Sequence, residues 1–263
     1  METVTVLLDG KRCPAEAGEP VLQVARRAGI DIPALCFREG MAPFGACRLC
    51  IVEVVAGGRP GLTTSCTLAA QDGLEIRTDT GEIRKIRQGL LELYLAQAPD
   101  SDYIRELAAK YGVTASRFAA AGTGEDADSA GEQKCVLCGL CVRICNEVIG
   151  AGVINFINRG PETEVNTPYL EPSSACIGCT ACADVCPTDV IRICDRGGVR
   201  MVQTWSQTEV PMQKCRICGQ YCAPEPLIDV VYKGVPDLAE ELRDICPKCR
   251  RRYKLRKMSH LSS

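Results

Sequence analysis

The sequence predicts an α+β fold assembled from small metal-binding modules, and three observations carry this prediction. The first third of the chain alternates strand-like patterns with one amphipathic helical pattern. Nineteen cysteines occur in 263 residues, and seventeen of them fall into spacings typical of metal ligands. Aromatic residues make up only 5% of the chain, so we expect bound metals to contribute to the stability of modules with modest apolar cores.

The N-terminal elements follow from local patterns. Apolar residues at every second position from 4 to 8, followed by Asp9-Gly10, predict a strand and a hairpin turn. Residues 20–29 have helical periodicity, with a proline in the first turn and a glycine at the end. Residues 51–55 and 74–77 have the composition of further strands. A hairpin, a helix and more strands together indicate one small α+β domain.

The rest of the chain divides by composition. Two helical patterns follow the first domain, and Ser101 is the expected N-cap of the second. A small, acidic, Gly-rich stretch then predicts a linker. The predicted segments are 1–80 (α+β domain), 81–120 (helical), 121–133 (linker), 134–200 (tandem cysteine runs) and 208–263 (cysteine-rich lobe with a basic tail).

The first cysteine set has the pattern C-x10-C-x2-C-x15-C. Its members are Cys36, Cys47, Cys50 and Cys66. Plant-type ferredoxins hold a [2Fe–2S] cluster with the same order of ligands but a shorter first gap. A four-thiolate zinc site is the alternative; such sites usually contain two C-x2-C pairs, and this set contains one. The spacing therefore favours a [2Fe–2S] cluster.

The second and third sets share the spacing C-x2-C-x2-C-x3-C, which is typical of bacterial two-cluster ferredoxins. Three cysteines of each run bind one cluster, and the fourth reaches across to the other. Cluster A is therefore assigned Cys135, Cys138, Cys141 and Cys186, and cluster B is assigned Cys176, Cys179, Cys182 and Cys145. Disulfides are a poor alternative, because disulfide frameworks belong to short secreted domains and this N-terminus has no signal-peptide pattern.

The stretch PALCFREGMAPFGACRLCIVEV, followed by TTSC, resembles the N-terminal part of the large iron–sulfur subunit of NADH dehydrogenase (complex I). It is equally similar to the diaphorase iron–sulfur subunit of NAD-linked hydrogenases and formate dehydrogenases. The resemblance covers about residues 1–195. It implies a β-grasp [2Fe–2S] ferredoxin domain followed by a bacterial-type 2[4Fe–4S] ferredoxin domain.

The chain departs from these families at one place. They usually carry one His and three Cys after the helix, and these residues hold another [4Fe–4S] cluster. The matching stretch here, LAQAPDSDYIRELAAKYGVTASRF, contains neither Cys nor His. We therefore expect residues 81–120 to lack a cluster. Electrons would then pass between the two ferredoxin domains by direct contact or through a cluster of a partner.

The last cysteine group leaves two alternatives. In the favoured one, two C-x2-C pairs, Cys215 with Cys218 and Cys246 with Cys249, bind one Zn²⁺. In the other, Cys215, Cys218, Cys222 and Cys246 hold a third [4Fe–4S] cluster. The basic residues between 248 and 257 form either a solvated helix face or a docking surface for an acidic partner.

These observations predict an electron-transfer subunit of a cytoplasmic, multi-subunit NAD(P)-linked oxidoreductase of the hydrogenase, formate dehydrogenase or electron-bifurcating type. The sequence has no Rossmann or P-loop motif, so the flavin and NADH are expected on another subunit, with a further redox subunit as the second partner. We expect no catalytic residue in this chain.

Two other functions are weaker. An iron-only hydrogenase would need a large catalytic domain, for which 263 residues leave no room. A redox-sensing or scaffold iron–sulfur protein remains the alternative. The net charge of −2 gives no indication of nucleic-acid binding, and no apolar stretch approaches the length of a membrane span.

Overall fold

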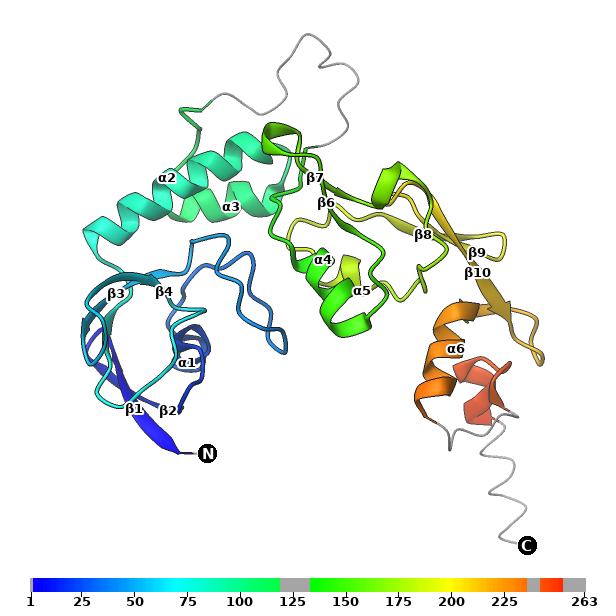
Figure 1. Cartoon of the computed structure of the whole chain (residues 1–263), viewed down its shortest axis with the longest axis horizontal. Helices are drawn as coiled ribbons and strands as arrows, with labels where there is room; N and C mark the ends of the chain where they lie inside the picture. The colour runs from blue at the N-terminus through cyan, green and yellow to red at the C-terminus, as the bar shows by residue number, and fades with distance from the viewer. Residues whose placement is uncertain (1, 119–132, 236–241, 253–263) are drawn as a thin grey trace, which may run out of the picture. The chain divides into compact units, whose positions relative to one another are not determined.

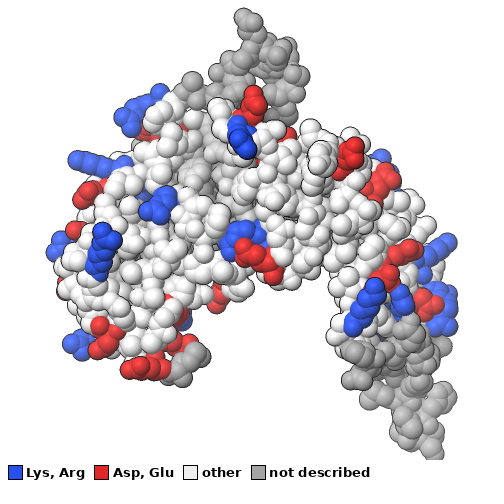
Figure 2. All heavy atoms as spheres, viewed as in Figure 1, with Lys and Arg blue, Asp and Glu red and all other residues white. Residues whose placement is uncertain are grey.

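The computed structural model describes residues 2–118, 133–235 and 242–252. It consists of two compact units, Met1–Leu140 and Cys141–Ser263. Among the described residues, no helix is both long and apolar enough to span a membrane. Figure 2 shows Lys and Arg side chains interspersed with Asp and Glu side chains on the face that it presents. The predicted linker and the end of the basic tail lie largely or wholly outside the described residues.

The first unit contains a five-stranded sheet with strand order β2-β1-β5-β3-β4 (Figure 1). Strands β1 and β5 pair in parallel, whereas the other neighbours are antiparallel. Helix α1 adds Val21, Leu22, Val24 and Ala25 to the core of this sheet. This is the predicted β-grasp arrangement. Its elements are β1 (Thr3–Leu8), β2 (Lys11–Glu16), α1 (Val21–Arg27), β3 (Ile51–Ala56), β4 (Gly61–Thr64) and β5 (Glu75–Arg77).

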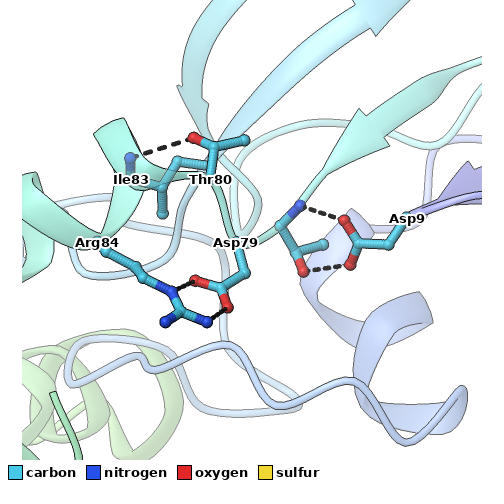
Figure 3. A network of polar contacts seen from close by, with 6 residues as sticks. Asp9, Asp79, Thr80, Ile83 and Arg84 are labelled. Carbon is cyan, nitrogen blue, oxygen red and sulfur yellow. Dashed lines mark hydrogen bonds and ion pairs between the residues drawn. The ribbon is translucent and has the colours of Figure 1, made fainter.

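The predicted turn at Asp9-Gly10 is present and serves two purposes. Both residues have positive φ angles, 49° and 81°, as a tight two-residue hairpin turn requires. The Asp9 carboxylate accepts hydrogen bonds from the backbone N–H and the hydroxyl of Thr78 (Figure 3). The turn is thereby tied to the end of β5, 69 residues further along the chain.

Helix α2 (Gly81–Gln97) starts directly after the sheet. The Thr80 side chain caps it by accepting the N–H of Ile83 (Figure 3). Helix α3 (Asp102–Lys110) packs beside α2, and Ser101 caps it as predicted, by accepting the N–H of Ile104 at 3.4 Å. Where the resembled families place cluster ligands, this chain buries apolar side chains such as Ile104, Ala108 and Val113. The expected lack of a cluster in this segment stays a prediction.

The second unit combines short helical turns with a four-stranded antiparallel sheet of order β11-β10-β9-β8. The 30 residues between the two cysteine runs form a small β6–β7 hairpin with two 3-10 turns. Helix α6 packs on β10 and β11 (Figure 1). The elements are α4 (Leu140–Arg143), η1 (Ile144–Ile149), β6 (Asn155–Ile157), η2 (Gly160–Glu162), β7 (Glu164–Asn166), η3 (Pro168–Leu170), α5 (Ala181–Asp184), β8 (Ile193–Arg196), β9 (Val199–Val202), β10 (Thr208–Lys214), β11 (Tyr221–Pro224) and α6 (Glu225–Gly234).

Candidate metal centres

The four predicted [2Fe–2S] ligands lie buried at one end of the β-grasp sheet. Cys36 and Cys47 come from the loop between α1 and β3, Cys50 immediately precedes β3, and Cys66 follows β4. The antiparallel β3–β4 pair brings Cys50 and Cys66 to neighbouring positions. The backbone N–H and the hydroxyl of Ser65 both donate to the carbonyl of Cys50, at 2.9 and 2.8 Å. The loop that carries these cysteines is therefore held by the sheet itself.

Hydrogen-bond donors surround these sulfur atoms. The N–H of Leu35 donates to Cys47 Sγ, and the N–H of Cys47 donates to Cys36 Sγ, each at 3.4 Å. A hydrogen bond from the Cys36 thiol, reinforced by backbone N–H groups, lowers the pKa of Cys47 to about 6. In the same way the Cys66 thiol lowers the pKa of Cys50 to about 7. Thiolates stabilised by N–H donors are what an iron–sulfur cluster requires.

Arg87 on α2 lies behind this loop and is only 2% exposed. Its guanidinium donates to the carbonyls of Leu49 and Ile51, at 3.1 and 2.8 Å, on the two sides of Cys50. Sequence reasoning missed this residue. The available signal was its position four residues from both Ile83 and Leu91, on the buried face of α2.

Tyr94, two turns further along α2, packs near Cys36, Cys47 and Cys138 in the first unit. Its hydroxyl donates to the carbonyl of Cys47 at 3.2 Å. Burial raises the pKa of Tyr94, and the nearby Cys47, Cys36 and Cys138 thiols raise it further. Cys138, a predicted ligand of cluster A, packs against the same hydrophobic cluster as Cys36 and Cys47. The first knuckle of the tandem runs therefore lies next to the [2Fe–2S] site.

The four cysteines assigned to cluster B line one cavity in the second unit. Cys145 of the first run thus stands together with Cys176, Cys179 and Cys182 of the second, as crossed binding requires. Apolar side chains complete the lining: Ile149, Val153, Ile154, Ile177, Ile193, Val202 and Trp205. An apolar wall excludes water and so influences the potential of an iron–sulfur cluster.

Trp205 supplies an independent sign that this cavity suits a cluster. Its ring is 4% exposed, and its indole N–H makes no hydrogen bond with any described residue. Buried donors are normally satisfied, so an unsatisfied one beside a cavity indicates an acceptor that belongs there. Burial raises the pKa of the nearby Cys182 thiol. Cluster sulfur or a cysteine thiolate is a suitable acceptor.

The residues assigned to cluster A belong to both units. Cys135 and Cys138 precede the boundary, whereas Cys141 and Cys186 follow it. The crossed ligand set of cluster A therefore stays a prediction from the spacing.

Four cysteines of the last group come together and the fifth does not. Cys215, Cys218, Cys246 and Cys249, here named the C-terminal thiol group, have all their sulfur atoms within 4.8 Å of one another. Cys222 lies outside this group, and its thiol donates to the carbonyl of Gln213 at 3.4 Å. The group could hold a metal ion, and its members are those of the predicted zinc site.

Two family models match the two ferredoxin-like parts of the chain. Residues 1–81 match the 2Fe-2S iron-sulfur cluster binding domain, and residues 134–190 match the 4Fe-4S dicluster domain. The cysteine-rich lobe beyond residue 208 lies outside both matches.

Curated relatives are subunits of pyridine-nucleotide-linked enzymes. The mitochondrial NADH-ubiquinone oxidoreductase 78 kDa subunit of Candida albicans is 30% identical over 206 residues, covering 72% of this chain. The alpha subunit of the NADPH-Fe(3+) oxidoreductase of Geobacter sulfurreducens is 27% identical over 237 residues, covering 84% of this chain. The chain spans only about a quarter of these relatives, 28% and 27% of their lengths.

A solved structure extends the similarity to three dimensions. It is a chain in the crystal structure of NAD+-reducing [NiFe]-hydrogenase in the H2-reduced state, with 28% sequence identity and a TM-score of 0.55. The match covers 73% of this chain and 84% of the hydrogenase chain. The chain thus carries a [2Fe–2S] domain followed by a [4Fe–4S] dicluster domain, and its relatives are complex I and NAD(P)-linked hydrogenase subunits, as the sequence predicted.

Proposed function

We propose that this chain is the electron-transfer subunit of a multi-subunit NAD(P)-linked oxidoreductase. It would relay electrons between a subunit that binds flavin and NADH and a second redox subunit of the hydrogenase, formate dehydrogenase or electron-bifurcating type. The proposed cofactors are one [2Fe–2S] cluster, two [4Fe–4S] clusters and one Zn²⁺ in the C-terminal thiol group. The NAD(P)-linked names of several relatives support the class of enzyme.

The observation that carries the proposal is the packing around Tyr94. Cys138 packs against the hydrophobic cluster that contains Cys36 and Cys47, and all three cysteines lie close enough to Tyr94 to add to the rise in its pKa that burial causes. The [2Fe–2S] site and the first knuckle of cluster A are therefore neighbours inside one compact unit. This favours direct electron transfer over passage through a partner's cluster, and it fits a relay that lacks the His-and-Cys cluster of the resembled families.

The chain's own residues favour bound clusters at these sites in two ways. Backbone N–H groups and the buried Arg87 surround the [2Fe–2S] site with positive potential, which favours the extra negative charge of a reduced cluster. Apolar side chains line the cluster B cavity. The iron–sulfur groups supply one-electron chemistry when bound.

Anaerobic reduction followed by electron paramagnetic resonance tests the proposal. The holoprotein is mixed with NADH alone, and then with NADH and the co-purified flavoprotein subunit. We expect signals of reduced [2Fe–2S] and [4Fe–4S] clusters only in the second mixture. Clusters that stay oxidised with the flavoprotein present, but that dithionite reduces, would contradict the relay and favour a redox-sensing or scaffold protein.

A further inference from the structure

The C-terminal thiol group has the dimensions of a site for a single metal ion. The Sγ atoms of Cys218 and Cys246 are 3.8 Å apart. Four thiolates bound tetrahedrally at about 2.3 Å from zinc are separated from one another by about 3.8 Å. In a [4Fe–4S] cube each thiolate binds a different iron atom, so its sulfur atoms stand farther apart. The geometry favours one ion over a third [4Fe–4S] cluster.

The backbone around the group folds as two metal-binding knuckles. The N–H of Cys246 donates to Cys215 Sγ at 3.3 Å, and the N–H of Cys249 donates to Cys246 Sγ at 3.4 Å. Gly219 has a φ of 70°, which lets the first knuckle turn back so that its N–H reaches the carbonyl of Cys215 at 2.9 Å. N–H donors that face thiolates compensate the negative charge of a four-thiolate site.

Around the thiol group, the described residues form only a small buried core. Its members are Cys215, Leu242, Ile245, Cys246 and Cys249, so three of these five described residues belong to the thiol group. A core of this size does not stabilise a fold without a metal or disulfide. Closed four-thiolate sites in small lobes are typical of structural Zn²⁺, which has no redox chemistry and accepts tetrahedral geometry without preference.

The strand hairpin that carries the first knuckle also touches the loop of cluster B. Cys215 directly follows β10, and β11 returns the chain to Pro224. The Pro224 ring lies so close to Gly178 that a Cβ there would stand 2.8 Å from Pro224 Cγ. Gly178 lies between two predicted cluster B ligands, and its carbonyl accepts a hydrogen bond from Arg200 of β9 at 2.7 Å. The β9–β11 part of the sheet therefore supports the cluster B loop from outside.

We propose that the C-terminal thiol group binds one structural Zn²⁺, and that this ion fixes the β10–β11 hairpin so that Pro224 supports the Gly178 loop. The zinc would then protect cluster B without carrying electrons. The second half of this proposal rests on the proposed function, because it requires cluster B; the zinc site does not.

Metal analysis of the anaerobically purified full chain tests the site. We expect about one zinc per chain, with about ten iron atoms from one [2Fe–2S] and two [4Fe–4S] clusters. About fourteen iron atoms without zinc would overturn the site in favour of a third cluster, and about eleven without zinc would replace Zn²⁺ by a single iron. One zinc with little iron would leave the site intact and contradict the proposed relay.

A matched pair of substitutions tests the assignment of ligands. We expect Cys246→Ser to lose the zinc and Cys222→Ser, in the same lobe, to retain it. Equal loss from both variants, or retention by both, would overturn the assignment. Because Cys246→Ser could unfold the lobe, the same analysis is made on wild-type protein after chelation of zinc.

Hydrogen–deuterium exchange tests the support of cluster B. Pro224→Ala keeps all four thiols and removes most of the ring that faces Gly178. We expect several-fold faster exchange in the loop 176–182 for both Cys246→Ser and Pro224→Ala, with unchanged exchange in the loop 36–50. Unchanged exchange in loop 176–182 of both variants would overturn the supporting role. Faster exchange in both loops would indicate general unfolding and would also count against it.

Discussion

The [2Fe–2S] site and the C-terminal thiol group each use four cysteines, yet they depend on their surroundings in opposite ways. The β-grasp core contains eighteen buried residues in its described part, of which only Cys50 and Cys66 are predicted ligands. In the described part of the C-terminal lobe, the buried cluster around the thiol group has five members, and three of them are its cysteines. In the first case an extensive apolar core positions the thiols, whereas in the second we propose that a bound metal ion positions the chain.

The largest expected effect is the different response of these two regions to loss of metal. We expect chelation of zinc to abolish the protection of residues 215–224 and 242–252 from hydrogen exchange. Structural zinc contributes roughly 10–16 kcal/mol of apparent binding free energy in small zinc-binding folds. Destruction of the [2Fe–2S] cluster should leave strands β1, β2 and β5 protected. If loss of the [2Fe–2S] cluster removed the hydrogen-exchange protection of the β-grasp strands as fully as loss of zinc removes that of the C-terminal lobe, the two regions would not differ in their dependence on metal.

In the [2Fe–2S] region, substitution of Arg87 is expected to have the largest effect of any single substitution. Arg87→Met removes the donors to the carbonyls of Leu49 and Ile51, and each buried unpaired acceptor costs about 1–3 kcal/mol. We expect a loss of stability of roughly that size per carbonyl, measured by denaturant unfolding under anaerobic conditions. Loss of a buried positive charge should also lower the reduction potential of the [2Fe–2S] cluster.

Arg84 is the matched control on the same helix. It is mostly exposed and pairs with Asp79 at the surface (Figure 3). Exposed ion pairs contribute about 0–1 kcal/mol. Arg84→Met should therefore leave the reduction potential of the [2Fe–2S] cluster unchanged. If it shifted that potential as much as Arg87→Met does, burial of the Arg87 guanidinium would not explain the effect.

Asp9→Ala tests how strongly long-range hydrogen bonds hold the β-grasp domain. The substitution removes both hydrogen bonds to Thr78 (Figure 3). We expect a loss of about 1–3 kcal/mol in the free energy of unfolding, since Asp9 is exposed and each of the two hydrogen bonds then contributes about 0.5–1.5 kcal/mol. The zinc content of the C-terminal lobe should not change, and a fall in zinc would show that the two regions are coupled.

Tyr94→Phe is expected to have the smallest effect. The ring is retained, and only the hydrogen bond to the carbonyl of Cys47 is lost. A single hydrogen bond of this kind contributes about 0.5–1.5 kcal/mol. Thermal unfolding should register this small change, whereas the rate of electron transfer should stay close to that of the wild type. A large fall in that rate would mean that the hydroxyl has more than a positional role.

Much of this organisation could be predicted because the cysteine spacings are local. The hairpin turn, the α1 to α3 helices and the Ser101 cap also depend on residues close together in sequence. The positions of Arg87 and Tyr94 behind the cysteine loop could not be predicted, since they follow from packing between segments about 36 to 47 residues apart. The contact of Pro224 with Gly178 is equally long-range, and nothing in either short segment indicates it.

The sequence also allowed two alternative sets of four metal ligands in the last cysteine group. Spacing alone allows Cys222 to serve as a ligand as well as Cys249. The structure separates them, because β11 turns the Cys222 thiol toward the carbonyl of Gln213, outside the thiol group.

The most direct test of the relay compares the reduction rates of the two cluster types after rapid mixing. NADH and the flavoprotein subunit are mixed with wild-type chain or with Tyr94→Ala, and samples are frozen for electron paramagnetic resonance. If electrons pass directly between the [2Fe–2S] site and cluster A, the substitution should leave the first reduced cluster type unaffected and slow the second. If the reduction rates of both cluster types are the same in the variant as in the wild type, direct transfer past Tyr94 is contradicted.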